Sequence, residues 1–162
     1  AFMKNYNLTL SWSVFKNNEL EKSDRMLVEA AKKATDGSYS PYSEFRVGAA
    51  LLLDDGTVVT GSNQENAAYP SGLCAERTAL FAAGHNYPGK IVIAIAIAAR
   101  NTDGWTEKPI TPCGACRQVM AETEALSGRP IRTILYGEEE TMVIPDGTAM
   151  LLPFCFETES MA

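Results

Sequence analysis

The sequence predicts an α/β fold in which helices cover both faces of a central mixed sheet, giving a three-layer α-β-α sandwich. The first observation is size and composition, since 162 residues with 46% apolar and 21% charged residues suit one globular domain with its own core. The second is the order of the segments, because helical and β-rich patterns alternate along the chain. The third is the apolar run IVIAIAIAA, which is typical of a strand buried on both faces. We therefore expect a single domain over residues 1–162.

The first elements expected are an edge strand and a helix. The apolar residues of Phe2–Leu20 alternate loosely, as in a strand at a sheet edge. A helix is expected from Ser23 to about Thr35, because Ser23 is a favourable N-cap and apolar residues follow at helical spacing. Gly37 ends this helix. The polar composition of Tyr39–Glu44 predicts a loop.

A β-hairpin is expected next. Val47–Leu53 and Thr57–Thr60 are rich in β-forming residues, and the turn sequence Asp54-Asp55-Gly56 stands between them. The remaining segments predict two helices, two strands and a short last helix. Their expected ranges are Leu73–Ala83 (helix), Ile91–Ala98 (strand), Cys113–Leu126 (helix), Ile131–Tyr136 (strand) and Gly147–Leu152 (short helix).

The charge of the chain narrows the choice of partners. Its formal net charge is −6 and its pI is near 4.8, which argues against a nucleic acid polymer, because such binding needs a basic face. A small nucleoside is not excluded by this argument. The longest apolar run has nine residues, whereas a membrane-spanning helix needs about 20. With no signal-peptide pattern at the start, we expect a cytoplasmic protein whose four cysteines are metal ligands, catalytic thiols or buried residues.

Three cysteines stand where helices are expected to begin. Cys113 and Cys116 are three residues apart, so on a helix both sulfurs lie on one face, and Cys74 opens the preceding helix. Helix N-termini carry partial positive charge, which lowers thiol pKa values and offsets the charge of three thiolates on Zn²⁺. Arg77 can add a full positive charge nearby. Three protein ligands with water in the fourth position are typical of catalytic zinc, so we expect one Zn²⁺ per chain.

Glu76 lies two residues after Cys74 and is the expected proton shuttle, since it can take and return the proton of the water. Three other interpretations of the cysteines stay open. The C-x-x-C pair could be redox-active, Cys155 could complete a structural zinc site, or the cysteines could be buried without a metal. The single histidine, His85, follows Gly84 at an expected helix end and is predicted to be solvated.

Five segments of the chain, in order, resemble the cytidine deaminase family in its short, homotetrameric form with three cysteine ligands. The segments are YSPYSEFRVGAALL, NQENAAY, CAERTALF, PCGACRQ and LLPFCF. The resemblance covers about residues 23–156 and leaves residues 1–20 as an extension beyond the family core. It implies zinc-dependent hydrolytic deamination of cytidine and 2′-deoxycytidine to uridine and 2′-deoxyuridine, as in pyrimidine salvage.

The resemblance also implies a role for each matching residue. Cys74, Cys113 and Cys116 would hold the Zn²⁺ and Glu76 would shuttle protons, while Arg77 would hydrogen-bond a zinc-bound sulfur. The implied substrate contacts are Phe45 beside the nucleoside, Asn63 and Glu65 at the ribose 3′-hydroxyl, the backbone of Ala75 at the base, Tyr69 at a pocket shared with a neighbouring subunit, and Phe156 over the neighbour's base.

The pocket rim departs from the family pattern. Pro70-Ser71-Gly72 replaces the usual residues before Cys74, the stretch NTDGWTEKPIT looks longer than in short members, and the tail offers both Phe154 and Phe156 as the lid residue. One alternative substrate is therefore another amino-pyrimidine or a nucleoside antibiotic. A second alternative is a zinc-containing module that binds nucleoside without catalysis. Glu76 argues against that second alternative, because a binding module needs no proton shuttle.

Overall fold

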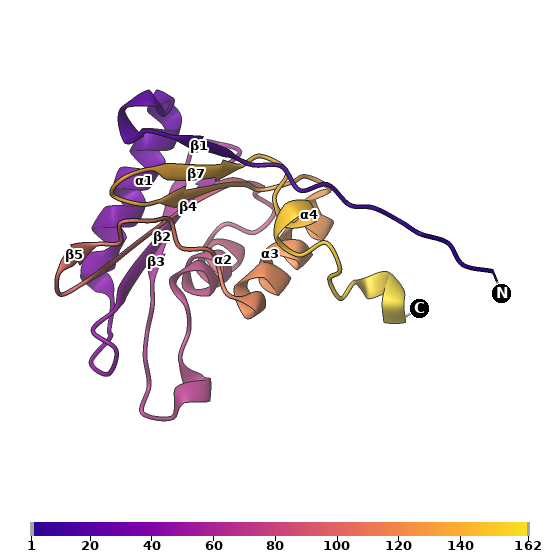
Figure 1. The fold of residues 1–162 in the computed structure, drawn as a ribbon. Coiled ribbons are helices and arrows are strands. Elements are labelled where there is room, and N and C mark those ends of the chain that lie inside the picture. The colour runs from indigo at the N-terminus through magenta and orange to yellow at the C-terminus, as the bar shows by residue number, and fades with distance from the viewer. Residues whose placement is uncertain (1, 162) are drawn as a thin grey trace.

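A computed structural model describes residues 2–161, without the side chains of residues 159 and 160, and shows a seven-stranded mixed sheet (Figure 1). The strands are β1 (Ser13–Phe15), β2 (Arg46–Leu53), β3 (Val58–Ser62), β4 (Val92–Asn101), β5 (Gly104–Trp105), β6 (Arg132–Tyr136) and β7 (Thr141–Ile144). They run in the order β1-β7-β6-β4-β2-β3, and β5 pairs with β4. The β4–β6 pair is parallel and the other pairs are antiparallel, which confirms the expected mixed sheet.

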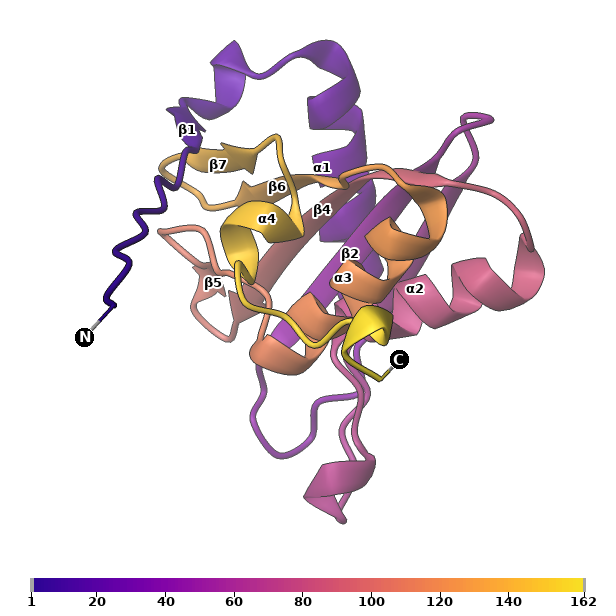
Figure 2. The same cartoon turned by 90° about the vertical axis from the view of Figure 1, so that its right-hand side faces the viewer.

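Helices form the two outer layers. They are α1 (Lys22–Ala34), α2 (Ala75–Asn86), α3 (Gly114–Ser127) and the short α4 (Thr148–Leu151), with 3-10 turns at Asn17–Glu19, Thr35–Gly37, Tyr69–Ser71 and Thr158–Met161. In Figure 2, α1 lies behind the sheet and α2 and α3 lie in front of it, which confirms the three-layer sandwich. None of the helices within residues 2–161 combines the length and the apolar character needed to cross a membrane.

The two central strands bury side chains on both faces of the sheet. Ala50 and Ala96 pack in the cluster under α1, whereas their neighbours Leu51 and Ile97 pack in the cluster under α2 and α3. Successive residues of a strand point to opposite faces, so a strand covered on both sides needs a continuous apolar run. This explains the run of apolar residues that predicted β4.

Two glycines allow the helices to approach the sheet closely. A Cβ atom on Gly61 would lie 2.5 Å from the backbone nitrogen of Ala79 in α2. A Cβ atom on Gly48 would overlap the carbonyl oxygen of Ala31 in α1. Any larger residue at either position would push a helix away from the sheet. The contact at Gly61 matters for function, because α2 carries part of the site described below.

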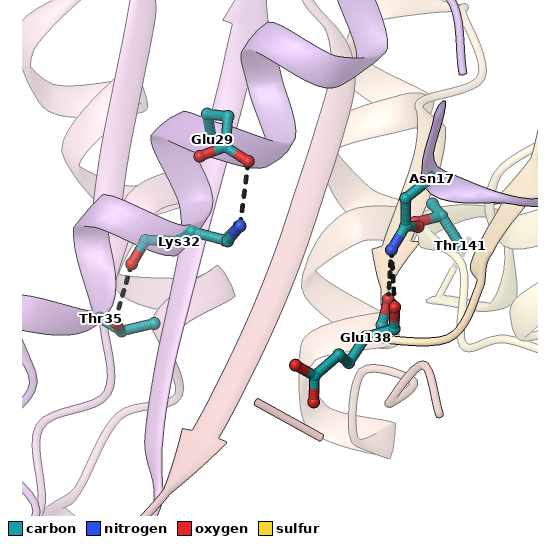
Figure 3. A network of polar contacts seen from close by, with 7 residues as sticks. Asn17, Glu29, Lys32, Thr35, Glu138 and Thr141 are labelled. Atoms are coloured by element: carbon teal, nitrogen blue, oxygen red, sulfur yellow. Dashed lines mark hydrogen bonds and ion pairs between the residues drawn. The ribbon is translucent and has the colours of Figure 1, made fainter. Parts of the chain in front are cut away.

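The N-terminal segment contributes less strand than the sequence predicts. Only Ser13–Phe15 pair with β7, and the apolar side chains of the preceding residues are exposed. Asn17 then ties this segment to the turn between β6 and β7 (Figure 3). Its Nδ2 atom donates to the carbonyl oxygens of Gly137 and Glu138, and its Oδ1 atom accepts from the hydroxyl of Thr141 at 2.6 Å.

The strands β5 and β7 are absent from the elements that the sequence predicts. β5 has two residues and β7 has four, so neither offers enough positions to show a period of two. The neighbouring strand supplies the hydrogen bonds that define each of them, and a neighbour in the sheet is visible only after folding. The predicted helices are confirmed, with boundaries that differ by a few residues.

Candidate active site

The N-terminal ends of α2 and α3 bring three cysteines together. Cys74 is the residue before α2 and Cys113 is the residue before α3, and both have extended backbones that lead into a helix. Cys116 lies in the first turn of α3 and is fully buried. The predicted placement of all three cysteines at two helix starts is therefore confirmed.

The sulfur atoms lie at the spacing of metal ligands. The Sγ atom of Cys113 is 3.6 Å from that of Cys74 and 3.5 Å from that of Cys116, and all three lie within 4.8 Å of one another. Tetrahedral zinc with Zn–S bonds of about 2.3 Å separates its sulfurs by about 3.8 Å. A disulfide bond would need about 2.05 Å, and all four cysteines of the chain are free. The donor set fits Zn²⁺, and within the described residues Cys155 is not part of this group.

Hydrogen bonds and charge around the sulfurs favour a thiolate. The pKa of Cys74 is lowered to about 5, chiefly by its side-chain contact with Cys116 and also by Arg77, whose Nη2 atom lies 3.7 Å from the Cys74 sulfur. The same contact with Cys74, together with burial, raises the pKa of the Cys116 thiol. Cys74 and Cys113 also lie at the positive ends of helix dipoles. The site is thus built to hold negative sulfur, and the contact expected between Arg77 and a ligand sulfur is present.

Glu76 follows Cys74 by two residues and lies in the first turn of α2. Its side chain is buried, with 5% of the residue exposed, yet it lines a cavity of about 640 Å³. Burial is the main cause that raises the pKa of this carboxyl above its usual range. A carboxyl group whose pKa lies above its usual range holds a proton more readily, which suits a group that must both accept and return one.

The cavity brings together most of the residues predicted for the site. Its lining includes Phe45, Asn63, Glu65, Tyr69, Cys74, Ala75, Glu76, Arg77 and Cys113. Tyr69 lies on the loop between β3 and α2, which extends away from the sheet in Figure 2. Phe156 does not line this cavity. It lines a separate hollow between α3, α4 and the C-terminal segment, and its side chain is largely exposed.

Asn63 and Glu65 reach the cavity from a continuation of β3. The backbone of this segment bonds to Tyr39 on one side, through Tyr39 N to Asn63 O and Glu65 N to Tyr39 O. Residues two apart in an extended segment share a face, so the predicted alternation holds beyond the end of β3. Asn63 also positions Phe45, because its Nδ2 atom donates to the Phe45 carbonyl at 2.9 Å and its Oδ1 atom accepts from Val47 N at 2.8 Å.

The loop before β2 also lines the cavity, through Tyr42 and Ser43, two residues that sequence patterns did not predict to be in the site. Hydrogen bonds from this loop, led by that of the Ser43 hydroxyl, lower the pKa of Glu65. The signal that could identify them is the position of the YSPYSE segment immediately before Phe45. Composition alone predicts only a loop there.

Comparison with known families agrees with this geometry. The family model described as the cytidine and deoxycytidylate deaminase zinc-binding region matches residues 21–127, which include the three cysteines and Glu76. The chain belongs to the cytidine deaminase family. The matched region of this family member begins after β1 and ends before the C-terminal segment that contains Phe156.

Individual relatives support the assignment of this family member. It is 44% identical over 137 residues to the cytidine deaminase of Halalkalibacterium halodurans, a match covering 85% of this chain and 96% of the relative. It is 45% identical to the cytidine deaminase of Sporosarcina psychrophila, covering 84% of this chain and 93% of the relative. The crystal structure of the Burkholderia pseudomallei cytidine deaminase superposes with a TM-score of 0.68 at 44% identity, covering 81% of this chain and 97% of that chain.

Proposed function

We propose that the protein is a zinc-dependent hydrolase that deaminates cytidine and 2′-deoxycytidine to uridine and 2′-deoxyuridine. The observation that carries this proposal is the buried carboxyl group of Glu76 at the cavity wall, beside the three-cysteine cluster. The relatives that match most of the chain are named cytidine deaminases, which supports the same reaction.

Each group of the site has a task in this reaction. Cys74, Cys113 and Cys116 would hold the Zn²⁺, which when bound would supply a Lewis acid that activates water for attack on C4 of the pyrimidine. Glu76 would accept one proton from the attacking water and deliver it to N3 of the base, and it would then take the proton of the new C4 hydroxyl and deliver it to the amine, which leaves as ammonia while C4 becomes the uridine carbonyl. The raised pKa of Glu76 suits these transfers, because the group must be a base in one step and an acid in the next. Arg77 balances the charge of the sulfurs through Cys74.

The charge of the cavity favours a nucleoside over a nucleotide. Of the described residues that line it, only Arg77 is cationic, and its guanidinium group is directed at the Cys74 sulfur. Glu65 and Glu76 add carboxylates to the same wall. A phosphate group would enter without a cation to pair with and would meet negative charge, which costs free energy. We therefore propose that the cavity binds an uncharged nucleoside. Phe45 would lie beside it, and Asn63 and Glu65 would bind the ribose 3′-hydroxyl. Tyr69 would lie at the pocket rim, and the backbone of Ala75 would contact the base.

The exposed aromatic residues of the C-terminal segment support an oligomer with shared sites. Phe154 is 90% exposed and Phe156 is 62% exposed in the single chain, and apolar surface of this kind marks protein interfaces. We propose a homotetramer in which Phe156 of one subunit covers the base in a neighbour's cavity.

The four free cysteines fit a reducing compartment, so the proposed location is the cytoplasm.

The test is a substrate panel on the purified protein with its zinc content measured. Absorbance should show rapid loss of cytidine and 2′-deoxycytidine and slow or no loss of free cytosine and deoxycytidine 5′-monophosphate. Protein with about one Zn²⁺ per chain that converts none of these compounds would disprove the proposed reaction. Equal rates with the nucleoside and its monophosphate would disprove the assignment to nucleosides.

A further inference from the structure

The carboxylate of Glu65 is bound on both oxygens by a single turn of the chain. Its Oε2 atom accepts from the backbone N–H of Tyr42 at 2.9 Å and from that of Ser43 at 3.3 Å. Its Oε1 atom accepts from the hydroxyl of Ser43. A carboxylate offers about four acceptor positions, so these three bonds leave one free.

The hydroxyl of Ser43 connects two residues of the cavity wall. While it donates to Glu65, it accepts from the backbone N–H of Phe45 at 3.1 Å. Glu44, between them, has a φ of 55°, the only positive φ at a non-glycine position among the described residues. A left-handed conformation at a glutamate costs free energy and is kept only where surrounding contacts hold it. The contacts here include the hydrogen bonds that join the Ser43 hydroxyl to Glu65 and to the backbone N–H of Phe45.

We infer that Ser43 is a positioning residue for substrate recognition: its hydroxyl orients the Glu65 carboxylate so that the remaining acceptor position meets the ribose 3′-hydroxyl. This inference rests on the proposed function, which places Glu65 at the ribose. The backbone donors fix only Oε2, and without the Ser43 hydroxyl the carboxylate can rotate about its last bond. Asn63 can add one donor to the cavity wall, because within residues 2–161 only one N–H of its amide is hydrogen-bonded.

The alternative is that Ser43 only stabilises the turn. The two explanations predict different effects of removing the Ser43 hydroxyl on substrates with and without a ribose 3′-hydroxyl. If Ser43 acts through Glu65, its loss affects only substrates that carry a 3′-hydroxyl. If it only stabilises the turn, its loss affects all substrates equally, because Phe45 and the wall around it move for each of them.

The experiment is steady-state kinetics of Ser43→Ala with cytidine, 2′-deoxycytidine and 3′-deoxycytidine. We expect KM to rise about tenfold for the first two, which is the cost of weakening one hydrogen bond to a charged group, with kcat changed less than threefold. KM for 3′-deoxycytidine should stay within twofold of the parent value. Because the comparison is made within one variant, a reduced fraction of folded protein does not alter it. A KM rise of the same size for all three nucleosides, or no rise for any, would overturn the inference.

Further variants separate the roles of the two residues. Ser43→Thr keeps a hydroxyl and should restore KM to within about twofold of the parent value. In a Glu65→Gln background, Ser43→Ala should add less than a twofold increase in KM, because coupled residues are not additive. A tenfold additional increase would overturn the inference. Ser11→Ala is the control, since Ser11 is exposed and contacts the rest of the chain through its backbone. If the parent protein deaminates no nucleoside, it is the proposed function that fails.

Discussion

Gln118 binds the backbone of Phe156 with both ends of its side-chain amide. Its Nε2 atom donates to the Phe156 carbonyl at 2.8 Å, and its Oε1 atom accepts from the Phe156 N–H at 3.2 Å. Gln118 lies two residues after Cys116 in α3, so the C-terminal segment is attached to the helix whose N-terminal end holds two cysteines of the cluster. The ring of Phe156 nevertheless stays away from the cavity of its own chain. Because the ring is directed away from its own cavity, the first prediction concerns its effect on the site of a neighbouring subunit.

Phe156→Ala should raise KM for cytidine by about tenfold while the zinc content stays unchanged, because stacking on the base is worth about 1–3 kcal/mol. Gln118→Ala should also raise KM, by a smaller factor, because it frees the backbone that carries the ring.

Mixed oligomers of Phe156→Ala and Glu76→Gln chains should be more active than the sum of the two parents, because some sites combine an intact Glu76 with a neighbour's intact Phe156. Activity equal to that sum, or full activity of a monomer in light scattering, would rule out the shared site.

Glu76→Gln should keep the zinc and the fold but lower kcat for cytidine by at least about 10²-fold. An amide can occupy the same place but cannot carry protons, and general acid–base groups contribute roughly 10²–10⁴-fold. Kinetics, metal analysis and circular dichroism on the same preparation check this prediction. The control is Glu122→Gln on α3, because Glu122 lines the separate hollow and not the catalytic cavity. A Glu76→Gln enzyme within tenfold of the parent would remove Glu76 from the proposed mechanism.

Cys113→Ala combined with Cys116→Ala should abolish stoichiometric zinc binding, because it removes two of the three ligands. Cys155→Ala should keep about one Zn²⁺ per chain, since Cys155 contacts Glu157 and not the cluster. Elemental analysis after gel filtration measures both. Removal of the metal with a chelator should lower the melting temperature of the parent and leave that of the double variant unchanged, because metal binding stabilises the folded state. Full zinc content in the double variant would contradict the ligand assignment.

Gly61→Ala should destabilise the protein by about 1–3 kcal/mol, because the added methyl group would lie 2.5 Å from the backbone of α2. Gly84→Ala is the matched control, since Gly84 lies within α2 and a Cβ atom there meets no atom within 4 Å. That change should stabilise the protein by roughly 0.5–1 kcal/mol through the higher helix propensity of alanine. Urea denaturation of the zinc-loaded proteins measures both free energies. Equal effects of the two substitutions would mean that the contact between Gly61 and α2 can relax.

Local patterns predicted the helices and the long strands because each of these elements carries its own signal. The period of apolar residues in α1 and the continuous apolar run of β4 need no knowledge of neighbours. The cysteine cluster was predictable for a similar reason. Cys113 and Cys116 are close in sequence, and Cys74 and Cys113 each come directly before a segment with a helical pattern. The roles expected for Asn63 and Phe45 come from the family resemblance, and the structure shows that both residues line the cavity and are joined by a hydrogen bond.

What the sequence by itself determined is therefore the fold class, the family, the clustering of the three cysteines at two helix starts and the position of Glu76 beside them. Only the tertiary structure decided which strand pairs with β1, how Ser43 binds Glu65, and where Gln118 places Phe156. These contacts join residues that are 22 positions apart for Ser43 and Glu65 and 38 positions apart for Gln118 and Phe156. A hydrogen bond between distant residues depends on how the intervening helices and strands pack, and no local period or propensity records that packing.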